Sequence, residues 1–243
     1  MMKKIPTLEI FGPTIQGEGS VAGKKTMFLR TAGCDYSCVW CDSSFTWDGS
    51  SKEDIKLMSS QDIYTRLVEL GGNNFSHVTI SGGNPLLLEG LSELVDILKE
   101  KNIEIAVETQ GTKWQDWLLN INDITISPKP PSSKMETNLD KLDFMIENLA
   151  TSAVNSKTSL KVVIFDDEDF EYAKVIHKRY PLIPFYLQVG NIDINEKNND
   201  KLIKDLLLKY EWLINKVLSA REMNRVFVLP QLHTLLWGNK RGV

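Results

Sequence analysis

All three cysteines of this 243-residue chain lie in one short segment, as Cys34, Cys38 and Cys41. Three thiols cannot all pair as disulfides, because a disulfide framework needs an even number of cysteines. Gly33 comes directly before them and lets the chain bend, so the three sulfurs can face one metal centre. Soft thiolates select zinc, Cu(I) or iron–sulfur clusters. A four-iron cluster usually has four cysteine ligands, so three would leave one iron open to a ligand from outside the protein.

Two other interpretations of the cysteines stay open on these observations alone. The residues could be structural, because a free cysteine packs as a small hydrophobe. They could also bind zinc together with a histidine. The histidines His77, His177 and His233 all lie far from the cysteines in sequence, however. The second short ligand pair that structural zinc sites usually show is also missing from the sequence.

The composition is that of an ordinary soluble protein, with 42% hydrophobic and 25% charged residues. The net charge of −4 gives no reason to expect a nucleic-acid surface, and no apolar run is long enough to span a membrane. Residues 1–6 lack the apolar core of a signal peptide. Clustered thiols are typical of a reducing compartment. These features together predict a cytoplasmic protein.

Short strand-like runs alternate with amphipathic stretches of helical period along most of the chain. Such alternation predicts right-handed βαβ units around a parallel sheet, hence an α/β fold that is either an incomplete barrel or an open sheet. Residues 1–243 are expected to form a single domain. The predicted strands are 7–11, 26–31, 77–80, 103–107, 124–126, 160–165, 185–189 and 226–229, and the predicted helices are 60–70, 91–101, 114–120, 139–149, 168–179 and 201–218.

Polar, glycine-rich segments follow six of the predicted strands. In parallel α/β folds the residues just after each strand line the working face, so these segments are expected to meet around one cofactor and substrate cavity. They are residues 34–41, 81–85, 108–111, 127–129, 188–191 and 231–233.

Two features near the N-terminus have both a structural and a binding interpretation. Residues 12–19 contain three glycines with Gln16 and Glu18, and could be a surface turn or a loop whose backbone approaches a ligand. Arg30, at the end of a predicted strand, could bind a carboxylate or phosphate through its guanidinium fork, or pair with a nearby acid.

Two of these segments resemble motifs of the radical S-adenosylmethionine (SAM) superfamily. One is the cysteine segment, with Trp40 before its last cysteine, and the other is Ser81-Gly82-Gly83-Asn84-Pro85, similar to the glycine-rich methionine-binding motif. From about Leu8 to the C-terminus the chain also resembles one family within it, the 7-carboxy-7-deazaguanine synthases of queuosine biosynthesis. The segments that carry this closer resemblance are Gln16-Gly17-Glu18-Gly19, Cys41-Asp42-Ser43, Glu108-Thr109-Gln110-Gly111, Ser127-Pro128-Lys129-Pro130 and Gln231-Leu232-His233.

The resemblance implies a partial (β/α) barrel of about six parallel strands and a homodimeric lyase. The implied reaction is the radical ring contraction of 6-carboxy-5,6,7,8-tetrahydropterin to 7-carboxy-7-deazaguanine, with release of ammonia. Its implied cofactors are a [4Fe-4S] cluster, SAM used catalytically, and Mg²⁺, with an electron donor such as flavodoxin or ferredoxin. Cleavage of SAM would yield a 5′-deoxyadenosyl radical, so the cofactor carries the chemistry and no side chain is expected to act as an acid or base.

The resemblance also implies a role for each site residue. The cluster ligands are Cys34, Cys38 and Cys41, and Ser43 is the Mg²⁺ ligand. The SAM contacts are Trp40, Asp42, Gly83, Asn84, Glu108, Ser127, Pro128, Lys129 and Gln188. The substrate contacts are Ile15, Gln16, Gly17, Glu18, Arg30, Ser81, Gln231 and His233.

Two positions depart from the pattern of the relatives. Asn84 stands where the superfamily commonly has an acid, and its amide can still accept a hydrogen bond from the ammonium of SAM but brings no charge. Ser43 stands where the family often has threonine, and it keeps the hydroxyl. Ser43 could instead cap the turn that follows it.

Two rival functions are retained. A radical SAM activase that makes a glycyl radical on a partner protein would need an open face for a large substrate. A non-catalytic zinc-binding module would need a fourth ligand beside the three cysteines.

Overall fold

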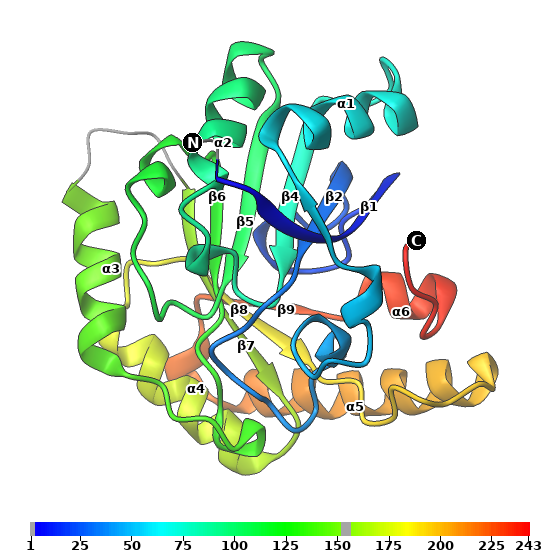
Figure 1. Cartoon of the computed structure of the whole chain (residues 1–243). Helices are drawn as coiled ribbons and strands as arrows, with labels where there is room; N and C mark the ends of the chain where they lie inside the picture. The colour runs from blue at the N-terminus through cyan, green and yellow to red at the C-terminus, as the bar shows by residue number, and fades with distance from the viewer. Residues whose placement is uncertain (1–2, 152–156) are drawn as a thin grey trace.

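In the computed structural model, which describes residues 3–151 and 157–243, nine strands form one sheet (Figure 1). They are β1 (Ile5–Ile15), β2 (Lys25–Thr31), β3 (Lys56–Met58), β4 (His77–Gly82), β5 (Glu104–Thr109), β6 (Asp123–Ile126), β7 (Lys157–Ile164), β8 (Phe185–Val189) and β9 (Val226–Leu229). Their order across the sheet is β3-β1-β2-β4-β5-β6-β7-β8-β9. From β2 to β9 the neighbouring strands are parallel, whereas β1 is antiparallel to both β2 and β3. Residues 1 and 2 of the N-terminal segment considered above lie outside the described residues.

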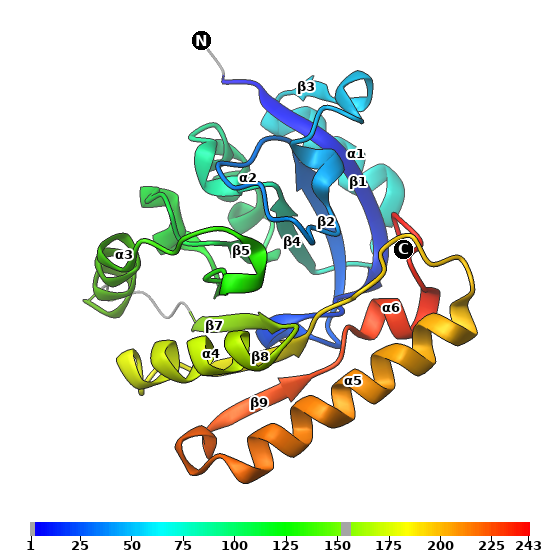
Figure 2. The same cartoon turned by 90° about the horizontal axis from the view of Figure 1, so that it is seen from below.

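Helices follow the strands, and all of them except the short C-terminal helix lie along the outer side of the curved sheet (Figure 2). They are α1 (Ser60–Gly71), α2 (Leu91–Glu100), α3 (Leu139–Thr151), α4 (Asp167–Arg179), α5 (Asn199–Ser219) and α6 (Leu232–Trp237). The edge strands β3 and β9 do not pair with each other, so the barrel is partial. Over the described residues, no helix has the length and apolarity that crossing a membrane requires.

The two faces of the parallel strands differ in polarity because successive side chains of a strand point to opposite faces. The face toward the helices is apolar and fully buried, with Val78, Ile80, Ile105, Val107, Ile124, Ile126, Leu160, Val162 and Ile164. The face toward the barrel interior carries Glu108, Thr125, Ser159 and Lys161. The register pairs Glu108 with Thr125, and Thr125 with Ser159, so these polar groups lie side by side inside the barrel. The interior is therefore suited to a polar site and the outer face to the core.

The predicted α/β partial barrel is confirmed, with seven parallel strands, β2 and β4 to β9, where about six were expected. The predicted helix at 114–120 is wrong, because the chain forms only a five-residue 3₁₀ helix, η5 (Asp116–Asn120). Before it, the Trp114 indole donates to Asp116 and the Gln115 amide donates to the carbonyl of Leu86, each at 2.8 Å. These contacts hold the connection in a tight turn, where short 3₁₀ pieces are usual. The short elements β3 and α6 were not predicted, and the single domain stays a prediction that the continuous sheet supports.

The hairpin between β1 and β2 turns into the open side of the barrel. Its 3₁₀ turn, η1 (Gly19–Val21), contacts β6, β7 and β8. Gly19 has a φ of +65°, and a Cβ there would lie 3.1 Å from the Thr125 hydroxyl oxygen. Val21, at the end of the same turn, is buried. The turn thereby carries the adjoining segment 16–18 to the inner wall of the barrel.

The packing of this turn gives a test of the fold. Gly19→Ala is expected to lower the free energy of unfolding by about 1–2 kcal/mol, the cost of a non-glycine residue in the left-handed region, plus the cost of crowding Thr125. Gly23 is the matched control, because it also has a positive φ of +84° but nothing within 4 Å of its Cβ position. Denaturant unfolding of both variants measures the difference. Equal losses at the two positions would contradict a role for the Thr125 contact.

Candidate active site

Two adjoining cavities open at the carboxyl ends of the parallel strands. The first, of about 150 Å³, is lined by the three cysteines and is called here the cysteine cavity. The second, of about 400 Å³, is lined by the β1–β2 hairpin, the start of α6 and the C-terminal segment 238–243, and is called the hairpin cavity. The residues that line both are Glu18, Asp42, Ser43, Ser81, Gly82, Glu108 and Asn191. A ligand in one cavity can therefore contact a ligand in the other.

The cysteine loop leaves β2 and is tied to two neighbouring segments. The amide of Gly33 donates to the carbonyl of Thr46 at 2.8 Å, and the Trp40 indole donates to the Ser132 hydroxyl at 2.9 Å. Inside the loop, the amide of Cys41 donates to the carbonyl of Cys38 at 3.1 Å. The loop is thus held at both ends, and all three cysteines line one cavity as free thiols.

Two glycines at the end of β4 allow this loop to pass close by. A Cβ at Gly83 would lie 2.0 Å from the carbonyl oxygen of Gly33, and one at Gly82 would lie 2.2 Å from that of Thr31. The approach is secured by hydrogen bonds from the amide of Gly83 to Thr31 and from the amide of Asn84 to Gly33, at 3.2 and 2.8 Å. Gly83 also lines the cysteine cavity, as its predicted SAM contact requires. The close approach of the cysteine loop is a second reason why position 83 needs a glycine.

Burial keeps the three thiols protonated when no metal is bound. Burial raises the pKa of Cys38 to about 11, and burial also raises the pKa values of Cys34 and Cys41. The Cys34 sulfur accepts hydrogen bonds from the Gln110 amide and from the backbone of Tyr36, each at 3.5 Å. A cluster would displace the protons as it binds, since only thiolates ligate metals. Three sulfurs on one cavity wall fit a three-cysteine iron–sulfur site.

The residues predicted to contact SAM fall into two groups. Trp40, Asp42, Gly83, Glu108, Ser127 and Lys129 line the cysteine cavity. There the Lys129 ammonium donates to the Ser127 hydroxyl at 3.1 Å and lies 6.0 Å from the centre of the Trp40 ring. Asn84, Pro128 and Gln188 are also described by the structure but lie outside both cavity walls. Gln188 is fully buried, and neither polar atom of its side chain has a partner among the described residues.

Asn84 is fully buried, and each polar atom of its side chain has a partner within the protein. Its amide nitrogen donates to Asp35 and to Thr112, and its oxygen accepts from the Thr109 hydroxyl, all at 2.9 Å. Asn84 therefore ties the cysteine loop to the end of β5. The predicted contact with SAM stays a prediction, and the structure gives the amide a role that needs no ligand.

The predicted substrate contacts gather around the hairpin cavity. Ile15, Gln16, Gly17, Glu18, Arg30, Ser81 and His233 line it, while Gln231 lines the cysteine cavity. Arg30 donates to Glu9 at 2.9 Å and lies between the rings of Phe11 and Phe45, 5.4 and 5.3 Å from their centres. Sequence reasoning missed Arg241, which also pairs with Glu9 and lies 3.8 Å from the centre of the Phe45 ring. Glu9 thus anchors two arginines at this cavity, and its single negative charge can balance only one of them.

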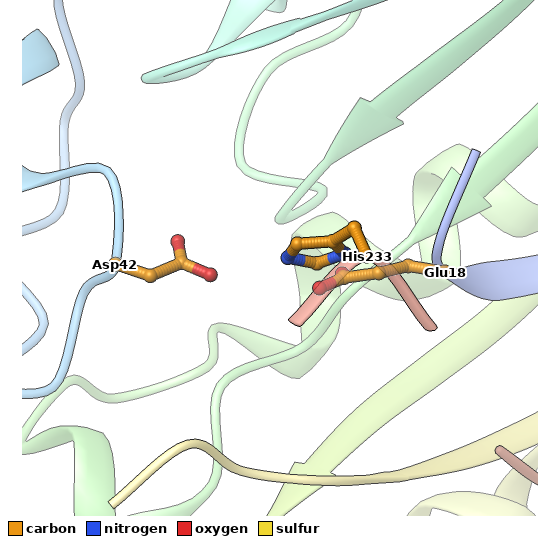
Figure 3. Close-up of side chains that lie close together, drawn as sticks. All are labelled: Glu18, Asp42 and His233. Atoms are coloured by element: carbon orange, nitrogen blue, oxygen red, sulfur yellow. The ribbon is translucent and has the colours of Figure 1, made fainter. Parts of the chain in front are cut away.

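Glu18, Asp42 and His233 meet where the two cavities join (Figure 3). One ligand atom from each lies within 4.8 Å of the others. Gly17 packs beneath the imidazole, because a Cβ there would lie 2.3 Å from its Nδ1 atom. A set of two carboxylates and an imidazole can bind a cation or the N–H groups of a heterocycle. The Glu18 carboxylate already accepts hydrogen bonds from Lys161 and Gln231.

A buried ion pair lies behind Glu18. The ammonium of Lys161 pairs with Glu18 and lies 3.7 Å from Glu108. Burial by itself would raise the pKa of Glu18, but Lys161 and His233 outweigh it and hold that pKa well below its usual range. Burial raises the pKa of Glu108. Sequence reasoning missed Lys161, although a lysine within the apolar run of β7 was a signal that could have found it.

The structural class of the chain follows from this geometry. Residues 28–128, from within β2 through the cysteine loop to the end of β6, match the model of the Radical SAM superfamily. A partial barrel with three free cysteines after its first parallel strand is the fold and site of that class.

Relatives of known name make the assignment narrower. The 7-carboxy-7-deazaguanine synthases of Bacillus cereus and Bacillus subtilis are each 63% identical to this chain, over 100% of both chains. The chain belongs to the 7-carboxy-7-deazaguanine synthase family. The crystal structure of QueE from Escherichia coli has a TM-score of 0.65 and 22% identity, covering 95% of each chain, and shows the same fold.

The contact between Gly83 and the cysteine loop predicts the behaviour of a variant. Gly83→Ala is expected to displace the loop, because its Cβ would overlap the backbone of Gly33. The variant should lose most of the about four irons and sulfides that one cluster supplies per chain. Iron and sulfide analysis after anaerobic reconstitution measures this. Gly72→Ala, at a glycine with nothing within 4 Å of its Cβ position, is the control. Full loading of Gly83→Ala would contradict the proposed constraint.

Proposed function

We propose that the protein is a radical SAM lyase that converts 6-carboxy-5,6,7,8-tetrahydropterin to 7-carboxy-7-deazaguanine and releases ammonia. The observation that carries this proposal is the joining of two cavities, one lined by three free cysteines and the other by arginine and glutamate side chains. The first suits a cluster with SAM and the second suits a small anionic heterocycle. Family membership at 63% identity supports the same reaction.

The residues that would hold the cofactors lie in the cysteine cavity. Cys34, Cys38 and Cys41 would ligate the cluster, and Ser127 and Lys129 would contact SAM beside it. When bound, the cluster and SAM supply the one-electron cleavage that begins radical chemistry on the substrate.

The side chains of the hairpin cavity would orient the substrate. Arg30 would hold the substrate carboxylate through a charge-assisted fork, while Glu18 and Glu108 would accept N–H groups of the ring. The amide of Leu232 at the start of α6 donates to the carbonyl of Gly17 at 3.2 Å, which joins the helix to the hairpin.

The two rival functions are less well supported. A glycyl-radical activase needs an open face for a protein substrate, whereas here the hairpin and α6 are joined over a small cavity. A zinc-binding module would not need the conjoined cavity of arginine and glutamate side chains. The relatives that are 63% identical to this chain are named for neither of these functions.

Three further properties belong to this proposal as implications of the family resemblance. They are a flavodoxin or ferredoxin as electron donor, a cytoplasmic location, and a homodimer. A homodimer is supported by exposed apolar side chains on α5 and on the adjacent edge strand β9, which are Leu207, Leu208, Leu218 and Phe227.

Anaerobic turnover tests the reaction. Reconstituted protein, SAM and reductant should convert the carboxypterin to the carboxylated deazaguanine, followed by chromatography and mass spectrometry. The Cys38→Ala variant should form no product, because three ligands are the minimum for a cluster with one open iron. A colourless protein that binds one zinc and leaves the pterin unchanged would overturn the proposal.

The role proposed for Arg30 predicts a selective loss of substrate affinity. Arg30→Lys should raise KM by about tenfold or more, because lysine keeps the charge but cannot form two parallel hydrogen bonds. The affinity for SAM and the cluster content should be unchanged, and both serve as controls. If the wild-type protein bound carboxylated and decarboxylated pterins equally well, this role would be excluded.

The role proposed for Ser43 as a Mg²⁺ ligand predicts a change in metal activation. Ser43 lines both cavities, and its hydroxyl donates to Asp42 at 2.9 Å and makes no capping hydrogen bond to the turn that follows. Mg²⁺ keeps several waters and needs few protein ligands, so one hydroxyl with substrate oxygens would suffice.

Ser43→Ala should lower turnover about tenfold, which is the usual cost of altering a residue that supports a metal site. Added Mg²⁺ should restore little of this activity. Ser43→Thr keeps the hydroxyl and is the matched control, with nearly unchanged activity expected. The measurement is an anaerobic Mg²⁺ titration of all three proteins. Identical activation curves for wild type and Ser43→Ala would exclude the assignment.

A further inference from the structure

Lys161 is a buried cation at the wall between the two cavities, and none of the roles assigned so far uses it. It projects from the middle of β7 into the barrel, and its side chain is 6% exposed. A lysine buried to this degree is costly unless its charge is paired. Both partners are carboxylates that line both cavities, Glu18 and Glu108. The lysine therefore connects the two acids that a bound substrate would meet.

Each of these acids is held on a particular oxygen atom. Glu18 accepts from Lys161 on Oε2 and from the Gln231 amide on Oε1, the latter at 3.0 Å. Glu108 accepts from the Gln16 amide on Oε1 at 3.2 Å, and Lys161 approaches the same oxygen. Neither of these contacts uses Oε2 of Glu108. These contacts fix the orientation of both carboxylates. They also leave carboxylate lone pairs free to accept hydrogen bonds from a ligand in the cavity.

The charges of this cluster do not balance. One ammonium faces two carboxylates, and Asp42 adds a third negative group on the same wall. Removing Lys161 would leave two largely buried carboxylates close together, and such groups rotate apart or take up a proton. Either change would remove an acceptor for a ring N–H group.

We infer that Lys161 is a positioning residue, which orients Glu18 and Glu108 so that they accept hydrogen bonds from the N–H edge of a 2-amino-4-oxopyrimidine ring. This inference rests on the proposed function, because the pterin substrate carries such an edge. It assigns specificity for the ring to a residue that does not itself need to touch the substrate. The carboxylate end of the substrate is recognised separately, at Arg30.

The test compares substrate affinity in Lys161→Met with that in the wild type. Lys161→Met has a side chain of similar length without charge. Loss of one charge-assisted hydrogen bond should raise the Kd and KM of the carboxypterin about tenfold or more, with kcat changed far less. The Kd is measured anaerobically without reductant, so it does not depend on turnover. Lys161→Arg, which keeps the charge, should recover much of the affinity.

Lys174→Met is the matched control for loss of a paired lysine. Lys174 also pairs with two glutamates, Glu171 at 2.8 Å and Glu222 at 3.2 Å, but lies on α4 away from both cavities. Its removal should leave Kd, KM and kcat unchanged. A loss of affinity equal to that of Lys161→Met would show a general effect of stability and would overturn the inference.

A double-mutant cycle separates positioning from packing and also covers poor folding of the single variant. In the Glu18→Gln background the loss of Lys161 leaves only one carboxylate, Glu108, without its ammonium. Lys161→Met should therefore disturb the fold less in that background, and it should weaken binding several-fold less than it does in the wild-type background. An equal loss in both backgrounds would show that Lys161 acts independently of Glu18 and would overturn the inference. If Lys161→Met cannot be purified, the comparison of Glu18→Gln with the double variant Glu18→Gln/Lys161→Met decides. A tenfold loss of affinity between these two proteins would also overturn the inference.

The outcomes distinguish this inference from the function on which it rests. Wild-type protein that neither binds nor converts the carboxypterin would overturn both. Wild-type turnover combined with an unchanged Kd in Lys161→Met would overturn only the positioning role.

Discussion

The site depends on the close approach of two strand ends. Where β2 and β4 finish side by side, the backbone of Gly82 and Gly83 lies so near Thr31 and Gly33 that no Cβ fits between them. This contact sets the direction in which the chain leaves β2, and therefore the face on which the cysteines lie. Parallel strands bring all their carboxyl ends to one edge of the sheet. The segments that follow the other parallel strands therefore line the same cavity as the cysteine loop.

Charge pairing organises the rest of the interior. The outer face of the strands is apolar, whereas the inner face carries Lys161 and Glu108, and Lys161 also pairs there with Glu18 of the β1–β2 hairpin. Such groups are tolerated only where each charge has a partner. The same logic holds at the far end of the hairpin cavity, where Arg30 and Arg241 share Glu9. The two cavities thus differ in kind, since sulfur lines one and pairs of opposite charges surround the other.

Several structural findings change the meaning of single residues without changing the overall assignment. Gly83 and Asn84 both belong to a motif expected to hold SAM, yet both also position the cysteine loop through contacts inside the protein. The segment 114–120 has apolar residues at helical spacing but forms a 3₁₀ turn, because the short connection between β5 and β6 overrides a weak local preference. The side chain of Ser43 makes no capping hydrogen bond to the turn that follows it and donates to Asp42 instead.

The sequence by itself determined the features that depend on neighbours in the chain. Cysteine spacing defined the metal loop, the alternation of strands and helices defined the parallel sheet, and the segments after the strands marked most of the cavity wall. Only the tertiary structure decided which distant side chains meet. Lys161 pairs with Glu18 across 143 positions, and Gln231 reaches the same carboxylate across 213. These contacts arise because the β1–β2 hairpin folds into the open barrel and α6 closes beside it. Strand order and hairpin placement create them, and neither leaves a periodic signal in the sequence.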